Sequence, residues 1–252
     1  MIVTNAVWEK RNLGVETVEI VLEDNDRIED IRSTLNLYCQ SEYSVIKVPS
    51  FCFDAIREVQ EHGYTFIESA LSLSIKPSKM VVEPRFKSIV SNCSYHEMND
   101  EERQYLEEQI HRGIFSTDRI YVDPAFTHDA AAQRYINWMH DLSERKNPIM
   151  NVMYGNDAVG FFVADKKPGN VYDGVLAGVY EPYLNTGMGY CVQWAGVDYA
   201  RTNDAQKYLG HISLNNPGVL KLLLSLGYNV TRSYYVFIRH GGNKSEYTGE
   251  NF

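Results

Sequence analysis

Alternating apolar and polar residues predict strands in the first third of the chain, and apolar residues at helical spacing predict helices between them. Residues 16–22 and 65–75 alternate with a period of two, as strands with one buried face do. Ile28, Ile31 and Leu35 recur at helical spacing. The predicted strands are 16–22, 44–48 and 65–75, and the predicted helices are 24–37 and 53–62, the second ended by Gly63.

A segment without a clear period follows these elements. Residues 76–86 (KPSKMVVEPRF) contain two prolines and are the best candidate for a linker. We therefore divide the chain into an N-terminal α/β part, residues 1–80, and a larger domain, residues 81–252. The chain end, residues 241–252, is predicted to be a frayed tail.

The larger domain is predicted to open with two helices and a hairpin. The first helix covers 101–111; Asn99 caps it and Glu102 completes a capping box. The second covers 127–145 and carries one apolar stripe. Strands at 149–154 and 158–164 are joined by the turn Gly155-Asn156-Asp157.

Residues 171–239 carry the most informative pattern: strand, Gly-rich turn, helix, strand, helix, strand. Gly187 and Gly189 lie between an apolar strand and an amphipathic helix. A turn that opens a helix presents backbone N–H groups and the positive end of the helix dipole, which suits a pyrophosphate. Gly-x-Gly alone is unspecific, so the flanking elements carry the prediction. Asn216 and Pro217 are placed to cap and begin the second helix.

Part of this pattern occurs twice. Residues 54–75 align over residues 218–239 without a gap, so that Gly63-Tyr64 matches Gly227-Tyr228. Two explanations stay open: a pattern common to all strand–helix–glycine–strand units, or a degenerate duplication whose N-terminal copy has lost the Gly-rich turn. In both cases only the C-terminal copy could hold a phosphate.

The charge limits the possible partners. The net charge of −9 over 252 residues repels phosphate backbones, so nucleic acid is not expected as a partner. A phosphorylated ligand must then be held by local N–H groups or a few arginines.

The cysteines and the N-terminus indicate an intracellular protein. Cys39, Cys52, Cys93 and Cys191 are scattered, which predicts four reduced thiols rather than a zinc site or a disulfide framework. No secretory signal and no apolar run of membrane-spanning length is visible. We expect a cytoplasmic protein that binds neither a metal nor a membrane.

The C-terminal motifs resemble those of the GCN5-related N-acetyltransferase (GNAT) superfamily. In that family an Arg/Gln-x-x-Gly-x-Gly/Ala turn binds the pyrophosphate of acetyl-CoA, and an Asn and a Gly-aromatic pair follow. The resemblance implies an α/β fold, a mixed central sheet flanked by helices, with a smaller degenerate GNAT-like N-terminal part. The implied acetyl-CoA contacts are Gly178, Val179, Tyr180, Leu184, Asn185, Thr186, Gly187, Met188, Gly189 and Asn216.

The whole chain is similar, more narrowly, to the TDP-fucosamine acetyltransferases of bacterial surface-polysaccharide synthesis. The shared features are Trp8-Glu9 with Gly14-Val15, Lys47-Val48-Pro49, Gly63-Tyr64, and Tyr234 and Tyr235 close to Arg239. This similarity implies acetyl transfer from acetyl-CoA to the amine of an amino sugar, most plausibly a nucleotide-linked one. By family analogy the helix at 128–145 and the loop before it lie on the acceptor side. Arg119 and Tyr121 of this loop could then meet the sugar or its diphosphate, and Arg119 could equally be an ordinary surface residue.

Two residues depart from the GNAT pattern. Leu184 replaces the Arg or Gln that opens the turn, and Leu223 replaces the Tyr that usually protonates the departing CoA thiolate. Because a free thiol has a pKa of about 8.5, the loss of the acid should slow the reaction rather than forbid it.

Other residues must then move the protons. Asp173, Glu181 and His211 are candidate bases, although a strand His is more often a core residue. Tyr228, Tyr234 and Tyr235 are the nearest substitutes for the missing phenol, although most tyrosines serve packing. The predicted catalytic residues are His211, Tyr228 and Tyr234.

The sequence supports an amine N-acetyltransferase as the first hypothesis. The alternatives are a non-catalytic acyl-CoA-binding protein, suggested by Leu184 and Leu223, and an acetyltransferase for a peptide or another small amine. A homodimer is expected by analogy only.

Overall fold

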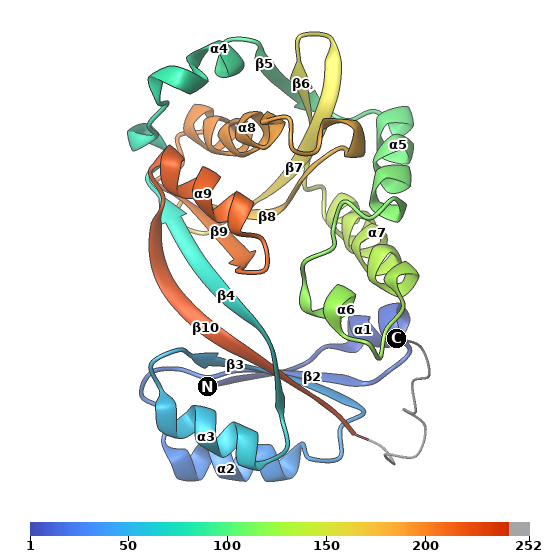
Figure 1. The fold of residues 1–252 in the computed structure, drawn as a ribbon, viewed down its shortest axis with the longest axis vertical. Helices are drawn as coiled ribbons and strands as arrows, with labels where there is room; N and C mark the ends of the chain where they lie inside the picture. The colour runs from blue at the N-terminus through green and yellow to red at the C-terminus, as the bar shows by residue number, and fades with distance from the viewer. Residues whose placement is uncertain (242–252) are drawn as a thin grey trace. The chain divides into compact units, whose positions relative to one another are not determined.

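The structure is a computed structural model that describes residues 1–241 (Figure 1). All but the first residue of the predicted tail, 241–252, lies outside the described residues. The described chain divides into two compact units: residues 1–69 with residues 234–241, and residues 70–233. The predicted division at residue 80 differs from this one. Residues Ala70–Ile75 of the strand β4 (Thr65–Ile75) pair with residues 208–213 of the C-terminal unit, and residues 234–240 pair with residues 43–49 of the N-terminal unit.

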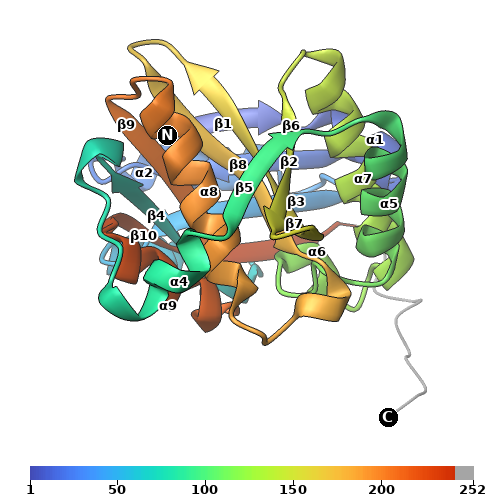
Figure 2. The same cartoon turned by 90° about the horizontal axis from the view of Figure 1, so that it is seen from above.

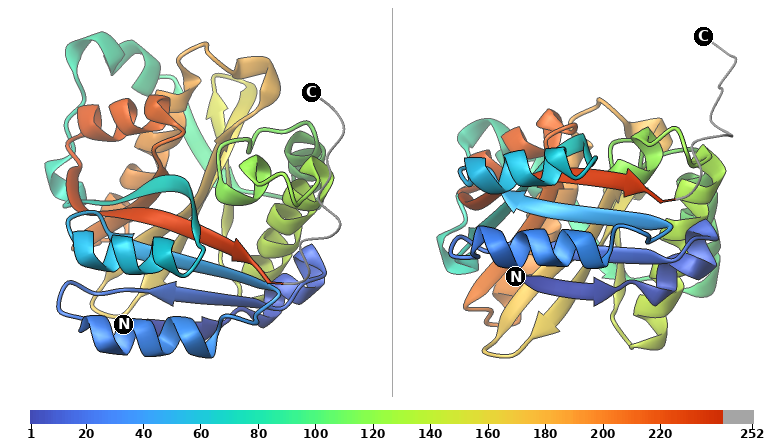
Figure 3. Two further views of the ribbon diagram at one scale, coloured as in Figure 1. Left: turned by 60° about the horizontal axis from the view of Figure 1, so that its bottom comes forward. Right: turned by 90° about the horizontal axis from the view of Figure 1, so that it is seen from below.

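The N-terminal unit is a sheet with two helices packed on one face (Figure 3). Its strand order is β1-β2-β3-β10, in which β2 and β3 are parallel. Ile31 and Leu35 of α2 and Val59 of α3 meet Ile20, Ile46 and Phe237 of the sheet in one apolar core. The elements are β1 Ile2–Asn5, α1 Val7–Leu13, β2 Thr17–Val21, α2 Ile28–Leu37, β3 Tyr43–Pro49, α3 Phe53–Glu61, and parts of β4 and of β10 Asn229–His240.

The C-terminal unit is a sheet with the strand order β4-β9-β8-β7-β6-β5, in which only β8 and β9 run parallel. Helices α8 and α9 pack on one face, and α5 and α7 pack on the other (Figure 2). The elements are α4 Lys87–Val90, β5 Cys93–Glu97, α5 Asp100–His111, α6 Arg119–Val122, α7 His128–Glu144, β6 Ile149–Tyr154, β7 Asp157–Lys167, β8 Val171–Val179, α8 Met188–Thr202, β9 Lys207–Ser213 and α9 Pro217–Leu226.

Alternation along β7 explains why this sheet buries both faces. Phe162 points into the core with α8 and α9, and its neighbour Phe161 points into the core with α5 and α7. Both rings are fully buried. A strand covered on both sides needs a continuous apolar run, which Val159 to Ala164 supplies.

The predicted helix starts are confirmed. The Asn99 side chain accepts a hydrogen bond from the Glu102 N–H at 3.0 Å, and the Glu102 carboxylate accepts one from the Asn99 N–H at 3.0 Å. The Asn216 side chain accepts from the Val219 N–H at 3.2 Å, so Asn216 caps α9. Strands β1 and β5 and the helices α1, α4 and α6 lie where no element was predicted.

The repeat seen in the sequence extends to a repeated strand–helix–strand unit. Ala70 of β4 lies opposite Ser213 of β9, and Tyr234 of β10 lies opposite Pro49 of β3. Adding 164 to the residue number carries one pair onto the other: Ala70 corresponds to Tyr234, and Pro49 corresponds to Ser213. The same shift carries β3, α3 and β4 onto β9, α9 and β10, and β2 pairs with β3 in parallel as β8 does with β9.

The N-terminal copy lacks a phosphate-binding turn. Residues 22–27 connect β2 to α2 and contain no glycine, and the chain's amino group lies 2.7 Å from the Asp26 carboxylate. Strand β2 also pairs with β3 along its whole length. An acidic connection beside two strands that pair along their whole length does not favour the binding of a phosphate group.

The expectation of four reduced thiols is wrong for two of the cysteines. Cys93 of β5 and Cys191 of α8 form a disulfide with their Cα atoms 6.1 Å apart, whereas Cys39 and Cys52 are free. These two cysteines are separated by 98 residues, and only the packing of α8 beside β5 brings them together.

Two further findings concern metals and membranes. Within residues 1–241 no helix is both long and apolar enough to span a membrane. Over the same residues no group of three or more His, Cys, Asp or Glu side chains is placed to hold a metal ion.

Candidate functional site

The site begins with a gap between two parallel strands. Strands β8 and β9 pair only from Val171–Lys207 to Gly174–Gly210. Beyond this point β8 continues to Val179 and β9 continues to Ser213, with no pairing between them in the described chain. We call this opening the β8–β9 gap and its closed end, at Gly174 and Gly210, the apex.

Backbone N–H groups of β8 point into this gap. The Tyr180 N–H donates to the Val159 carbonyl of the preceding strand at 3.0 Å, so it is not available to a ligand. Because direction alternates along a strand, the N–H groups of Val179 and Ala177 point the opposite way, toward the gap. Among the implied acetyl-CoA contacts Gly178, Val179 and Tyr180, only Val179 thus turns its N–H toward the gap.

The Gly-rich turn follows the end of β8 that lies away from the apex. Asn185 and Gly187 adopt positive φ angles of 62° and 91°, and Gly187 is the N-cap of α8. Within residues 1–241 the N–H groups of Gly187, Met188 and Gly189 have no hydrogen-bond partner. They therefore form a cradle of donors at the positive end of the α8 dipole.

Close packing restricts two of the glycines near the gap. A Cβ at Gly189 would lie 2.9 Å from Leu222 of α9, and a Cβ at Gly178 would lie 2.8 Å from Phe161. In contrast, a Cβ at Gly187 would meet nothing within 4 Å, so only its φ angle requires glycine.

Three polar side chains from adjacent strands meet at the apex. Ser72 of β4 lies directly opposite His211 of β9, and the Ser72 Oγ is 3.1 Å from the His211 Nδ1. The His211 Nε2 is 3.5 Å from the Asp173 Oδ1 of β8. Because Tyr208 and Ile212 of β9 pack with α8 and α9, His211 faces the opposite side of the sheet, and its side chain is 57% exposed.

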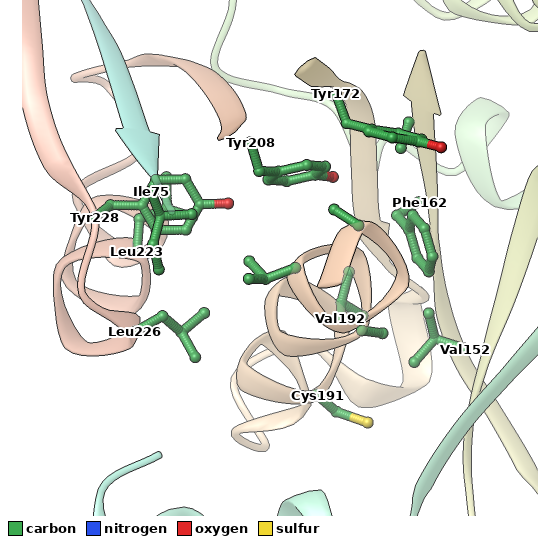
Figure 4. Close-up of a cluster of buried hydrophobic side chains, with 14 of the residues drawn as sticks. Ile75, Val152, Phe162, Tyr172, Cys191, Val192, Tyr208, Leu223, Leu226 and Tyr228 are labelled. Carbon is green, nitrogen blue, oxygen red and sulfur yellow. The ribbon is translucent and has the colours of Figure 1, made fainter. Parts of the chain in front are cut away.

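Tyr228 lies in the apolar core rather than beside the gap. It packs with Leu223 and Ile75 and is 4% exposed (Figure 4). Burial, with a smaller effect of Tyr208, holds the pKa of its phenol well above the usual value. A buried phenol of this kind favours a packing role. Leu223 is also buried, at 3% exposed, so the position of the missing phenol belongs to the same core.

The remaining predicted residues are dispersed. Tyr234 lies on the part of β10 that belongs to the N-terminal unit, so the C-terminal unit does not itself supply it to the gap. Leu184 is exposed. The Glu181 carboxylate pairs with Arg112 at 3.3 Å, and its N–H donates to the Gln109 side chain at 2.7 Å.

The segment between α5 and α6 lies beside the open end of the gap. The Asn215 side chain, just beyond β9, donates to the Thr117 carbonyl at 3.2 Å, and Arg112 pairs with Glu181 just beyond β8. Next to it, Tyr121 stacks on His128 with ring centroids 4.0 Å apart. Ser72 and Gln109 were missed in the sequence, because no local spacing links them to the site.

Known structures share this architecture, although no family model and no curated protein matches the chain. A GCN5-related N-acetyltransferase from Sphaerobacter thermophilus has a TM-score of 0.57 at 14% identity, covering 80% of this chain and 60% of that one. A tandem GNAT protein from the clavulanic acid biosynthesis pathway has a TM-score of 0.57 at 10% identity, covering 91% and 77%.

A third match is the glucosamine N-acetyltransferase region of a fungal multi-domain β-N-acetylglucosaminidase. Its TM-score is 0.55 at 11% identity, with coverage of 77% of this chain and 25% of that one. The chain thus spans 60% of the Sphaerobacter protein and a quarter of the fungal one. These likenesses show that the chain has the GNAT fold, as the sequence motifs predicted.

Proposed function

We propose that this protein is an N-acetyltransferase that transfers the acetyl group of acetyl-CoA to an amine. One observation carries the proposal: β8 borders an unpaired gap, and the turn that follows β8 presents a cradle of free N–H groups at the start of α8. The cradle suits the pyrophosphate of acetyl-CoA. The gap offers the extended arm of acetyl-CoA the backbone hydrogen bonds that a neighbouring strand would make. We assign the reacting end of the bound acetyl-CoA to the apex side of the gap, where the last β8–β9 pairs close it.

The groups around the gap supply the chemistry that acetyl transfer needs. Of the two N–H groups that face the gap, that of Ala177 lies nearer the apex than that of Val179, so we assign to Ala177 the hydrogen bond to the oxygen on which negative charge develops. His211 is the base that takes the proton of the amine, because it is an exposed imidazole at the apex with a carboxylate beside it. Leu223 offers no proton to the departing thiolate, which must leave unprotonated or take its proton elsewhere.

An amino sugar, nucleotide-linked and used in surface-polysaccharide synthesis, is the acceptor that we propose. The support is the end-to-end similarity of sequence features and the activity named for the fungal region, which is glucosamine N-acetylation. The alternatives are a peptide or another small amine, or acyl-CoA binding without turnover, which Leu223 favours. A homodimer and a cytoplasmic location stay predictions.

Calorimetric titration with acetyl-CoA tests the binding half of this proposal. The measurement is made on the protein and on the variants Gly187→Trp and Gly169→Trp. Both glycines have positive φ angles, 91° and 74°, and open space around them, but Gly169 precedes β8 at its far end. We expect micromolar binding that only Gly187→Trp abolishes; no binding to acetyl-CoA would refute both the enzyme and the binder.

A screen of amines tests the catalytic half. Glucosamine, nucleotide-linked amino sugars, small amines and a lysine peptide are each mixed with acetyl-CoA, and the free CoA thiol is measured. Thiol release that requires one class of amine identifies the acceptor. Tight binding without release for any of them would favour the non-catalytic protein.

A further inference from the structure

We infer that Ser72, His211 and Asp173 form a proton relay in which the Ser72 hydroxyl passes the proton of the acceptor amine to His211. The inference rests on the proposed function and names how its base is built. The three side chains come from adjacent strands, β4, β9 and β8, with 3.1 Å between Ser72 and His211 and 3.5 Å between His211 and Asp173.

The carboxylate determines which imidazole nitrogen is the base. An ionised carboxylate only accepts hydrogen bonds, so the Nε2 beside it must carry the ring proton. The Asp173 Oδ1 is buried and has no hydrogen-bond partner among the described residues, and the His211 Nε2 lies 3.5 Å from it. A ring proton on Nε2 is what would compensate the burial of this oxygen. Nδ1 is then left with a lone pair, and the Ser72 hydroxyl donates to it.

The relay keeps every proton accounted for. As the amine nitrogen attacks the thioester carbonyl carbon, its proton moves to the Ser72 Oγ, and the hydroxyl proton moves to the His211 Nδ1. The C–S bond then breaks and CoA leaves as the thiolate. The imidazolium, whose charge Asp173 balances, then gives its proton to that thiolate or to water. His211 thereby takes the place of the acidic phenol that the family has at the position of Leu223.

The N-terminal copy shows that the repeated fold does not need this constellation. The shift of 164 residues places Lys47 where His211 stands and Val236 where Ser72 stands, and these two lie opposite each other in the same register. The His–Ser pair therefore occurs only in the copy that has the gap and the N–H cradle.

Kinetics of variants test the relay. We expect Ser72→Ala and His211→Gln to lower kcat by roughly 10²–10⁴-fold with little change in the KM for acetyl-CoA. Ser72→Thr, which keeps a hydroxyl, should restore much of the rate. Ser74→Ala is the matched control, because Ser74 lies two residues along the same face of β4, opposite Leu209. Equal rates for Ser72→Ala and Ser74→Ala would overturn the relay while leaving the acetyltransferase intact.

Two further readouts separate a relay from a structural role. A proton inventory in mixed H₂O and D₂O should show two protons in flight for the protein and one for Ser72→Ala. Nitrogen-15 NMR should show His211 protonated at Nε2, and this tautomer should be lost in Asp173→Asn. A ring protonated at Nδ1, or an acetyl group found on Ser72 by mass spectrometry, would overturn the relay; failure of every amine to react would overturn the proposed function and the relay together.

Discussion

Replacing Gly187 by alanine should weaken acetyl-CoA binding much more than it weakens the fold. Gly187 has a φ angle of 91°, and a Cβ there would meet no atom within 4 Å. The substitution therefore adds no clash, and its cost is the left-handed backbone, about 1–2 kcal/mol for an L-residue. Gly169, with a φ angle of 74° and equally open surroundings, should cost the same when replaced by alanine.

The two variants should differ in their affinity for acetyl-CoA. A backbone at residue 187 that relaxes toward negative φ turns one N–H of the cradle away from the pyrophosphate. A hydrogen bond to a charged group contributes about 1.5–3 kcal/mol, so the Kd should rise roughly 10- to 150-fold. No N–H near Gly169 belongs to the cradle, so its variant should bind as the parent protein does.

Calorimetry and urea unfolding of the parent protein, Gly187→Ala and Gly169→Ala test whether the cradle binds acetyl-CoA. Unfolding should show equal losses of stability for Gly187→Ala and Gly169→Ala, and titration should show weakened binding only for Gly187→Ala. The reasoning is refuted if the two variants bind acetyl-CoA equally well, because the cradle would then contribute nothing to binding.

Three further outcomes follow from the packing. Tyr228→Phe should leave the rate of acetyl transfer within about twofold in a thiol-release assay, because the phenol is buried in the core; a drop of a hundredfold would return Tyr228 to the catalytic residues. Asn216→Ala should lower the free energy of unfolding by about 1 kcal/mol in urea, because it removes the cap of α9. Reducing the Cys93–Cys191 disulfide should lower the free energy of unfolding by up to about 4.7 kcal/mol, the loop-closure value for roughly 100 residues; an unchanged urea midpoint after reduction would contradict this.

The sequence determined the local elements and most of the Gly-rich turn that we propose as the ligand cradle. Period-two alternation gave β4 with its observed ends, and the capping residues Asn99 and Asn216 gave the starts of α5 and α9. Gly187 and Gly189 could be located because a turn between a strand and a helix leaves its mark on neighbouring residues. The repeat, too, was visible as an ungapped alignment.

Tertiary structure alone decided which distant residues meet. Ser72 and His211 are 139 residues apart, and only the antiparallel register of β4 and β9 places them opposite each other. Cys93 and Cys191 meet for the same kind of reason, which is why the expectation of free thiols failed. The gap itself depends on where two parallel strands stop pairing, and strand composition does not encode that point. Local patterns thus fix elements and caps, whereas register, burial and strand separation depend on contacts between segments far apart in the chain.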